Sequence, residues 1–206
     1  MQSPRAETFI TGLVLGAGGS KRLGRPKQLL PYGNRTLLGH ALATARACSF
    51  DQLVVSIGGA ADEVQERVDL SGADVIVNDD YGRGCSSSIA AALKAVNPRC
   101  EVLVLMLGDQ PGVTPAIVGT LLDGRDDALL AVCRYDDGRG HPLAFDRSVV
   151  PQLADLHGDK GVWRLLDRRA DDVVEVPIAG RIPLDVDTPE DYEAVLAAAG
   201  YTEVRA

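Results

Sequence analysis

The sequence predicts an α/β fold with a doubly wound, mostly parallel (mixed) sheet, and three observations lead to it. Short apolar runs alternate along the chain with stretches of helical periodicity. Most of these runs are continuously apolar, as is typical of strands that helices cover on both faces. Helix-start signals recur between the runs. Strand, helix and strand in this order form parallel pairs with right-handed crossovers.

The predicted strands are short and rich in valine and leucine. They cover residues 10–15, 53–57, 75–77, 102–107, 128–134, 142–145 and 173–176. Residues 136–140, with the sequence DDGRG, are typical of a hairpin turn. Because a hairpin joins antiparallel strands, the sheet is expected to become mixed at this point.

The predicted helices lie between these strands. They cover residues 37–47, 62–68, 86–96, 115–122, 162–168 and 189–199. Thr114-Pro115 and Thr188-Pro189 each place a capping hydroxyl before a proline at the first helical position. Both pairs therefore indicate where a helix begins.

Size and composition limit the class of protein. The chain of 206 residues fits one domain over residues 1–206. It contains no apolar run long enough to span a bilayer and no apolar signal region near its start. Four cysteines without a CxxC spacing favour reduced thiols over a zinc site. We therefore expect a cytoplasmic protein without membrane contact, and the formal net charge of -8 argues against a nucleic-acid partner.

The stretch 13–30, LVLGAGGSKRLGRPKQLL, concentrates positive charge in this acidic chain. It runs from the first predicted strand into glycines and then into Lys21, Arg22, Arg25 and Lys27. Ligands of doubly wound sheets lie beyond the carboxyl ends of the strands, where this loop belongs. Glycine N–H groups and basic side chains suit a phosphate. The loop therefore predicts a phosphate site, with a solvated turn as the plainer alternative.

Two familiar phosphate motifs do not fit this loop. The Walker motif requires Gly-Lys-Ser/Thr where this chain continues with Arg25-Pro26 after the glycine. The dinucleotide fingerprint requires a third glycine at the position of Lys21. It also requires an acid at the end of the second strand, which here ends in Ile57-Gly58-Gly59.

Two further segments supply carboxylates at predicted element ends. In VLVLMLGDQPGVTP, Asp109 follows an apolar strand, where it is suited to Mg²⁺ or to capping a turn before a proline. In PLDVDTPEDYEAVL, Asp185 and Asp187 point the same way if the segment is extended, so one cation could meet either. Glu190 and Asp191 are explained by the helix start that follows.

The glycine loop resembles the signature L-A-A-G-x-S-x-R-x-G-x-x-K of the MobA-like, GT-A-type nucleotidyltransferase superfamily. The matching positions are Leu15, Ala17, Gly18, Ser20, Arg22, Gly24 and Lys27, whereas Gly16 replaces the usual alanine. The resemblance implies a Rossmann-like fold of this type. It also implies that the backbone of Leu15, Gly16, Ala17, Gly18, Gly19 and Ser20 holds a nucleotide. Arg22 and Lys27 would hold the triphosphate, and Lys21 and Arg25 fall outside the motif.

The resemblance extends to other segments in the same order. It implies that Asp109 and Asp187 bind Mg²⁺, with Asp185 a lesser candidate. NDDYGRGCSSSIAAAL, which contains Ser86, resembles the loop that helps recognise the base and the second substrate. GHPLAF and LHGDKGVWRLL resemble motifs of the branch that cytidylylates molybdopterin, and their candidate substrate-binding residues are His141, Asp159 and Lys160. Each has a structural alternative, since a helix start, a strand edge or a turn would explain the same residues.

The implied reaction transfers CMP from CTP to the phosphate of molybdopterin and releases pyrophosphate. Arg22, Lys27 and Asp109 would be the catalytic groups. Ala17 favours CTP, because the guanylyltransferase branch usually carries glycine there. A GTP-dependent or other small-phosphate transferase is the first alternative. A noncatalytic cofactor carrier, which would serve a molybdoenzyme apoprotein, and a nicotinamide-dependent oxidoreductase are the others.

Overall fold

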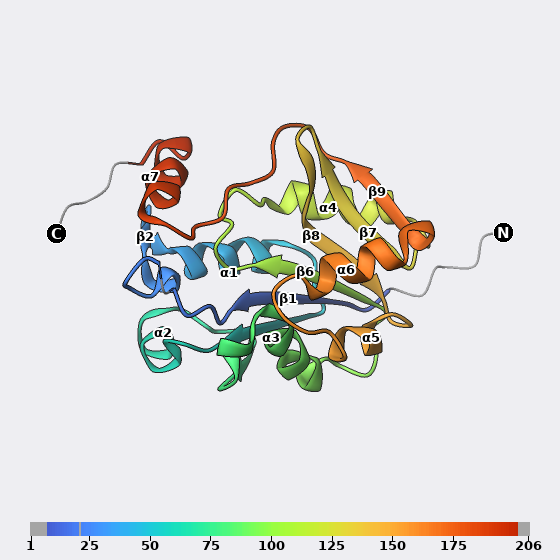
Figure 1. The fold of residues 1–206 in the computed structure, drawn as a ribbon, viewed down its shortest axis with the longest axis horizontal. Helices are drawn as coiled ribbons and strands as arrows, with labels where there is room; N and C mark the ends of the chain where they lie inside the picture. The colour runs from blue at the N-terminus through green and yellow to red at the C-terminus, as the bar shows by residue number, and fades with distance from the viewer. Residues whose placement is uncertain (1–7, 21, 202–206) are drawn as a thin grey trace.

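The computed structural model of the protein describes residues 8–20 and 22–201, and its central element is a seven-stranded sheet (Figure 1). The strands of the sheet are β1 (Ile10–Gly16), β4 (Gln52–Ile57), β5 (Asp74–Val77), β6 (Val102–Leu107), β7 (Leu130–Tyr135), β8 (Gly138–Asp146) and β9 (Val173–Pro177). Their order is β5-β4-β1-β6-β8-β7-β9. The doubly wound arrangement expected from the sequence is confirmed.

The sheet is parallel on one side and mixed on the other. β1 pairs in parallel with both β4 and β6, and β4 pairs in parallel with β5. β8 is antiparallel to β6 and β7, and β9 returns to a parallel pairing with β7. Asp136 and Asp137 form the tight turn between β7 and β8. The hairpin predicted from the DDGRG run is therefore confirmed, although its second strand begins at Gly138, before the predicted start.

Helices cover both faces of the sheet. They are α1 (Leu37–Ala47), α2 (Ala61–Arg67), α3 (Cys85–Ala92), α4 (Pro115–Arg125), α5 (Val150–Ala154), α6 (Gly161–Arg168) and α7 (Pro189–Ala198). α3 ends earlier than the predicted helix 86–96, because a 3₁₀ turn over Leu93–Ala95 follows it. The short helix α5 was not predicted. No described helix has the length and apolar character needed to cross a membrane.

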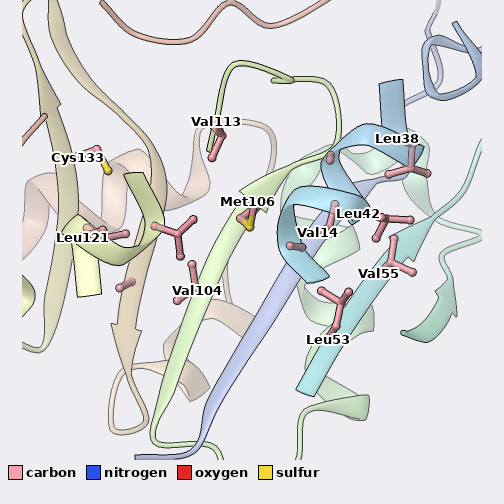
Figure 2. Close-up of a cluster of buried hydrophobic side chains, with 14 of the residues drawn as sticks. Val14, Leu38, Leu42, Leu53, Val55, Val104, Met106, Val113, Leu121 and Cys133 are labelled. Atoms are coloured by element: carbon pink, nitrogen blue, oxygen red, sulfur yellow. The ribbon is translucent and has the colours of Figure 1, made fainter. Parts of the chain in front are cut away.

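Side-chain alternation along the strands builds a core on each face. Val14 of β1 joins the cluster with α1, α2 and α4, whereas its neighbours Leu13 and Leu15 join the cluster with α3, α5 and α6. Figure 2 shows part of the first cluster, with Leu38 and Leu42 of α1 pointing toward the strands. Because every second residue is buried on each face, the carboxyl ends of β1, β4 and β6 are held in fixed register.

A third, smaller apolar cluster attaches the end of the chain. α7 packs on a two-stranded hairpin, β2 (Pro31–Tyr32) and β3 (Arg35–Thr36), beside which it lies in Figure 1. Thr188 caps α7 in a reciprocal capping box with Asp191. Thr114 caps α4 through its hydroxyl, which accepts a hydrogen bond from the N–H of Ile117. Both predicted helix starts are therefore confirmed, and the segment before α7 is held against the carboxyl edge of the sheet.

Candidate active site

A cavity of about 850 Å³ opens at the carboxyl edge of the sheet. The loops after β1 and β6 line it together with the segment before α7, whose Asp187 contacts Lys27, and β8 and α6 also contribute to its lining. Of the residues predicted for the site, the cavity is lined by Leu15, Gly16, Ala17, Gly18, Gly19, Ser20, Arg22, Lys27, Asp109, His141, Asp159 and Asp187. The candidate second carboxylate, Asp185, also lines it.

The loop after β1 has a shape fixed by hydrogen bonds to its carbonyl groups. The buried Gln28 amide donates to the carbonyl oxygens of Gly16 at 2.8 Å and Gly18 at 2.7 Å. The Ser20 hydroxyl accepts a hydrogen bond of 2.9 Å from the backbone N–H of Lys27. Within the part of the chain that the structure describes, the N–H groups of Gly18 and Gly19 have no acceptor. They remain available to an anion.

Lys27 brings together the two carboxylates that the sequence suggested as metal ligands. Its ammonium nitrogen, Nζ, lies 2.5 Å from Oδ2 of Asp109 and 2.9 Å from Oδ1 of Asp187. It also donates to the carbonyl oxygen of Val186 at 3.0 Å. The Lys27 side chain is only 15 % exposed. Three oxygen atoms from the loop after β6 and the segment before α7 therefore converge on one cation.

Burial and charge act in opposite directions in this cluster. Burial lowers the pKa of Lys27, but the charges and hydrogen bonds of Asp109 and Asp187 outweigh it and raise the pKa above its ordinary value. Burial raises the pKa of the Asp109 carboxyl, and Lys27 opposes this only in part. The pKa of Asp187 is lowered, because hydrogen bonds and charges from Lys27 and Arg22 exceed the effect of burial.

The remaining basic residues of the loop differ in their surroundings. Arg22 lies at the rim of the cavity, with Nη2 2.6 Å from Oδ2 of Asp187. The Arg25 guanidinium lies over the ring of Tyr192 in α7, 5.8 Å from its centroid. Lys21 lies outside the described residues. The loop is therefore joined to the segment around α7 by charge as well as by packing.

These oxygen donors fit a hard divalent cation. A positive charge, the Lys27 ammonium, is already held there by Asp109, Asp187 and the Val186 carbonyl. Among the described residues, no group of three or more His, Cys, Asp or Glu side chains could hold a metal. Mg²⁺ commonly uses one or two carboxylates and takes its other ligands from water and substrate phosphates. Such a donor set suits Mg²⁺ better than zinc.

The far side of the cavity is aromatic and basic. His141 of β8 lies edge-on to Trp163 of α6, with 5.4 Å between ring centroids. Burial lowers the pKa of His141 to about 4, so the ring is neutral near pH 7. Arg139, two residues earlier on β8, also lines the cavity and pairs with Asp167 at 2.6 Å. Sequence reasoning did not select Arg139, although the period of two along a strand puts it on the same face as His141.

Two predicted residues do not line the cavity. Ser86 is 2 % exposed, and its hydroxyl donates to the carbonyl oxygen of Gly158 at 2.6 Å. It therefore joins the first turn of α3 to the loop before α6 and does not line the cavity. Ser88, two residues further along α3, lines the cavity instead. Lys160 is exposed outside the cavity, whereas its neighbour Asp159 lines it and accepts a hydrogen bond from the N–H of Cys85.

Comparisons with known proteins define the class of protein. Residues 12–173 match the model of the MobA-like NTP transferase domain, and the chain belongs to this family of nucleotidyltransferases. It is 35 % identical to nicotine blue oxidoreductase of Paenarthrobacter nicotinovorans, over 74 % of this chain and 78 % of that protein. It is 30 % identical to molybdenum cofactor cytidylyltransferase of Escherichia coli K12, over 95 % of this chain and 98 % of that protein.

Solved structures agree with this assignment. The homologue of Mycobacterium tuberculosis Rv0371c from Mycobacterium sp. strain JC1 is 54 % identical and superposes with a TM-score of 0.88, covering 93 % of this chain and 96 % of that one. Rv0371c itself, crystallised with manganese, is 47 % identical with a TM-score of 0.84, over 93 % of this chain and 100 % of that one. The Rossmann-like nucleotidyltransferase fold that the sequence implied is confirmed.

Proposed function

We propose that this protein transfers CMP from CTP to the phosphate of a molybdopterin-type cofactor and releases pyrophosphate. One observation carries the proposal. The glycine loop with Arg22 and Lys27 meets Asp109 and Asp187 at the carboxyl edge of the sheet, inside a single cavity. The likeness to the Escherichia coli cytidylyltransferase over nearly the whole chain supports this choice of reaction. In the cell the product would pass to a molybdoenzyme apoprotein.

The chemistry requires charge neutralisation rather than a protein nucleophile. An oxygen of the acceptor phosphate attacks the α-phosphorus of CTP, and the bond from that phosphorus to the pyrophosphate oxygen breaks. The acceptor oxygen is already ionised near neutral pH, because the second pKa of a phosphate monoester is about 6. Arg22 and Lys27 would bind the triphosphate, and the N–H groups of Gly18 and Gly19 would complete its cradle.

Mg²⁺ is the proposed cofactor. Asp109 and Asp187 would hold it, and the ion would act as a Lewis acid that neutralises charge on the phosphates. The manganese complex of Rv0371c supports a divalent metal in this group of proteins. Asp185, which lines the same cavity, adds negative charge beside Asp109 and raises the pKa of that carboxyl.

The far side of the cavity suits the acceptor. The neutral ring of His141 and the indole of Trp163 offer apolar surface to a flat heterocycle such as a pterin. Arg139 offers positive charge to its phosphate. Ala17 supports CTP over GTP, because the guanylyltransferase branch usually carries glycine at this position.

A nicotinamide-dependent redox reaction is the second candidate, favoured by the identity with nicotine blue oxidoreductase. The loop lacks the third glycine of the dinucleotide fingerprint, and β4 runs into Gly58-Gly59 rather than an acid. These features favour nucleotidyl transfer over the redox reaction.

The test is a panel of α-³²P-labelled CTP, GTP, ATP and UTP with Mg²⁺ and purified molybdenum cofactor, with pyrophosphate release measured in parallel. We expect label to move to the cofactor from CTP alone. Transfer from GTP would overturn the choice of nucleotide and leave the transferase reaction standing. Tight binding of cofactor without transfer would indicate a carrier. Oxidation of NADH or NADPH, followed at 340 nm with the same acceptor, would favour the redox candidate.

A further inference from the structure

We propose that Lys27 is a tethered substitute for the metal ion. Its ammonium fills the cation site between Asp109 and Asp187 while nucleotide is absent, and it leaves only when a nucleoside triphosphate attracts it. Nucleotide and metal would then bind as a coupled pair, each weakly without the other. The proposal rests on the function proposed above, since it takes the triphosphate to lie on the glycine loop.

The geometry of the Lys27 ammonium is that of a fully coordinated cation. An ammonium has three N–H bonds, and Lys27 Nζ has three oxygen partners at 2.5, 2.9 and 3.0 Å. Two of these oxygens belong to Asp109 and Asp187. The other oxygen of Asp187 accepts from Arg22 at 2.6 Å. Asp187 therefore has both carboxylate oxygens engaged by cations before any metal arrives.

Lys27 and a divalent metal exclude each other from this site. Mg²⁺ binds carboxylate oxygens at about 2.0–2.1 Å, closer than an ammonium does, so an ion on the same oxygens would lie against Nζ. Like charges at that separation repel strongly, above all where water is scarce, and the Lys27 side chain is 15 % exposed. The positive charges of Lys27 and Arg22 also balance the negative charges of Asp109 and Asp187. A metal that entered without displacing Lys27 would meet two carboxylates whose charges are already balanced by cations, with Asp185 as a further negative charge in the same cavity.

The Lys27 ammonium can also reach a second binding position, beside the glycine loop. A methyl group added at Gly18 would lie 3.4 Å from Lys27 Cε, so the lysine stem passes beside the glycine loop. Its backbone is anchored by the hydrogen bond to Ser20. Rotation about the terminal bonds of the side chain is then enough to carry Nζ from the carboxylates toward a phosphate on the loop. When the Lys27 ammonium moves to the triphosphate, the carboxylates of Asp109 and Asp187 become available to the metal.

If the nucleotide raises the affinity for the metal by some factor, the metal must raise the affinity for the nucleotide by the same factor. Mn²⁺ serves as the probe, and its binding to the whole protein is measured by calorimetry with and without α,β-methylene-CTP, which does not transfer its nucleotide. For the native protein we expect the analogue to increase Mn²⁺ affinity tenfold or more. Lys27→Met keeps the length of the side chain without its charge. We expect this variant to bind Mn²⁺ without nucleotide at least tenfold more tightly than the native protein, and the gain from the analogue to shrink.

Lys94→Met is the matched control, because Lys94 is exposed on a 3₁₀ turn outside the cavity, and it should bind Mn²⁺ as the native protein does. Equal Mn²⁺ affinity with and without analogue in the native protein would overturn the proposal without recourse to any variant. The proposal would also be overturned if a folded Lys27→Met protein bound Mn²⁺ without nucleotide no more tightly than the native protein does. Coupled binding without label transfer would support the role of Lys27 and overturn the proposed reaction. Label transfer without coupling between Mn²⁺ and nucleotide binding would support the proposed reaction and contradict the role of Lys27 as a substitute for the metal.

Discussion

The Arg22 guanidinium donates to the Asp187 carboxylate at 2.6 Å, which joins the glycine loop to a residue 165 positions further along the chain. The Arg22 side chain is 66 % exposed. An ion pair this open to water contributes little to folding, and its charge is available to a ligand. The pair therefore positions a cation at the cavity rim rather than holding the loop in place.

Arg22→Ala is expected to leave the fold intact and to weaken nucleotide binding. The melting temperature should change by no more than about 2–4 °C, since an exposed pair contributes about 0–1 kcal/mol. CTP affinity should fall by roughly tenfold, the value of one charge-assisted contact of about 1.5 kcal/mol. Calorimetry with CTP and thermal melting check the two effects. A large loss of melting temperature with unchanged CTP affinity would show that the pair is structural.

Asp109→Asn separates a metal ligand from a turn-capping residue. Asparagine keeps the shape and caps as well as aspartate does, so a capping role predicts full activity. Burial raises the pKa of Asp109, so its charge is held at a cost in free energy, and loss of that charge should leave the protein folded. A metal role predicts a loss of transfer of about 10²-fold or more, as for other preorganised electrostatic contacts. Turnover with labelled CTP and a melting curve decide between the two.

The closest control for Asp109→Asn is Asp159→Asn. Asp159 lines the same cavity but pairs with the backbone of α3 rather than with Lys27. We expect a much smaller loss of transfer from this variant. If both variants lost transfer activity equally, the total negative charge of the cavity would be what matters, and a specific role of Asp109 in metal binding would be contradicted.

Gly58→Ala should disturb the glycine loop from outside the cavity. A Cβ at Gly58 would lie 2.8 Å from Cβ of Tyr81 and 2.9 Å from the carbonyl oxygen of Ala17. Neither atom sits at the end of a flexible side chain, so backbone must move. We expect a destabilisation of about 1–3 kcal/mol, measured by urea unfolding, together with weaker CTP binding.

Gly119→Ala is the comparison for that variant. Gly119 lies within α4, and an added Cβ would meet no atom within 4 Å. Alanine there should stabilise the protein by roughly 0.5–1 kcal/mol and leave CTP affinity unchanged. A Gly58→Ala protein as stable as the native one would show that the loop has more room than its contacts indicate.

The fold was predictable where burial is continuous and unpredictable where elements are short. Valine and leucine runs marked the strands because helices cover both faces of the sheet. The hairpin of β2 and β3 went unnoticed because its two-residue strands have no period to detect. α5 was missed for a similar reason, since it has five residues with Pro151 in its first turn.

Most of the predicted residues line the cavity, but their pairings could not be predicted. Asp109 and Asp187 stand at recognisable element ends, so each could be selected from the sequence. Their common partner could not, because Lys27 lies 160 positions from Asp187 in the chain. Nothing local to the sequence shows that Gln28 turns inward to hold the loop carbonyls, whereas Lys27 beside it faces the carboxylates. Such pairings depend on long-range packing.

His141 provides a test of the cavity's far side through the pH dependence of stability. Burial lowers the pKa of its ring to about 4 in the folded protein, whereas an unfolded histidine has a pKa of about 6.5. Between these values the unfolded chain binds a proton that the folded chain does not. Stability is therefore lost as the pH falls from about 6.5 to about 4, by about 1–3 kcal/mol for this residue.

His141→Gln removes the titrating ring while keeping a polar side chain. Relative to the native protein, the variant should gain stability as the pH falls from 7 to 4.5, because groups present in both proteins cancel in the difference. His157→Gln, at an exposed loop position, controls for the loss of a histidine elsewhere. Urea unfolding at each pH measures the free energies. If the native and His141→Gln curves stay parallel from pH 7 to 4.5, the ring is solvated, and the cavity wall beside Trp163 is more open than the contact between the two rings indicates.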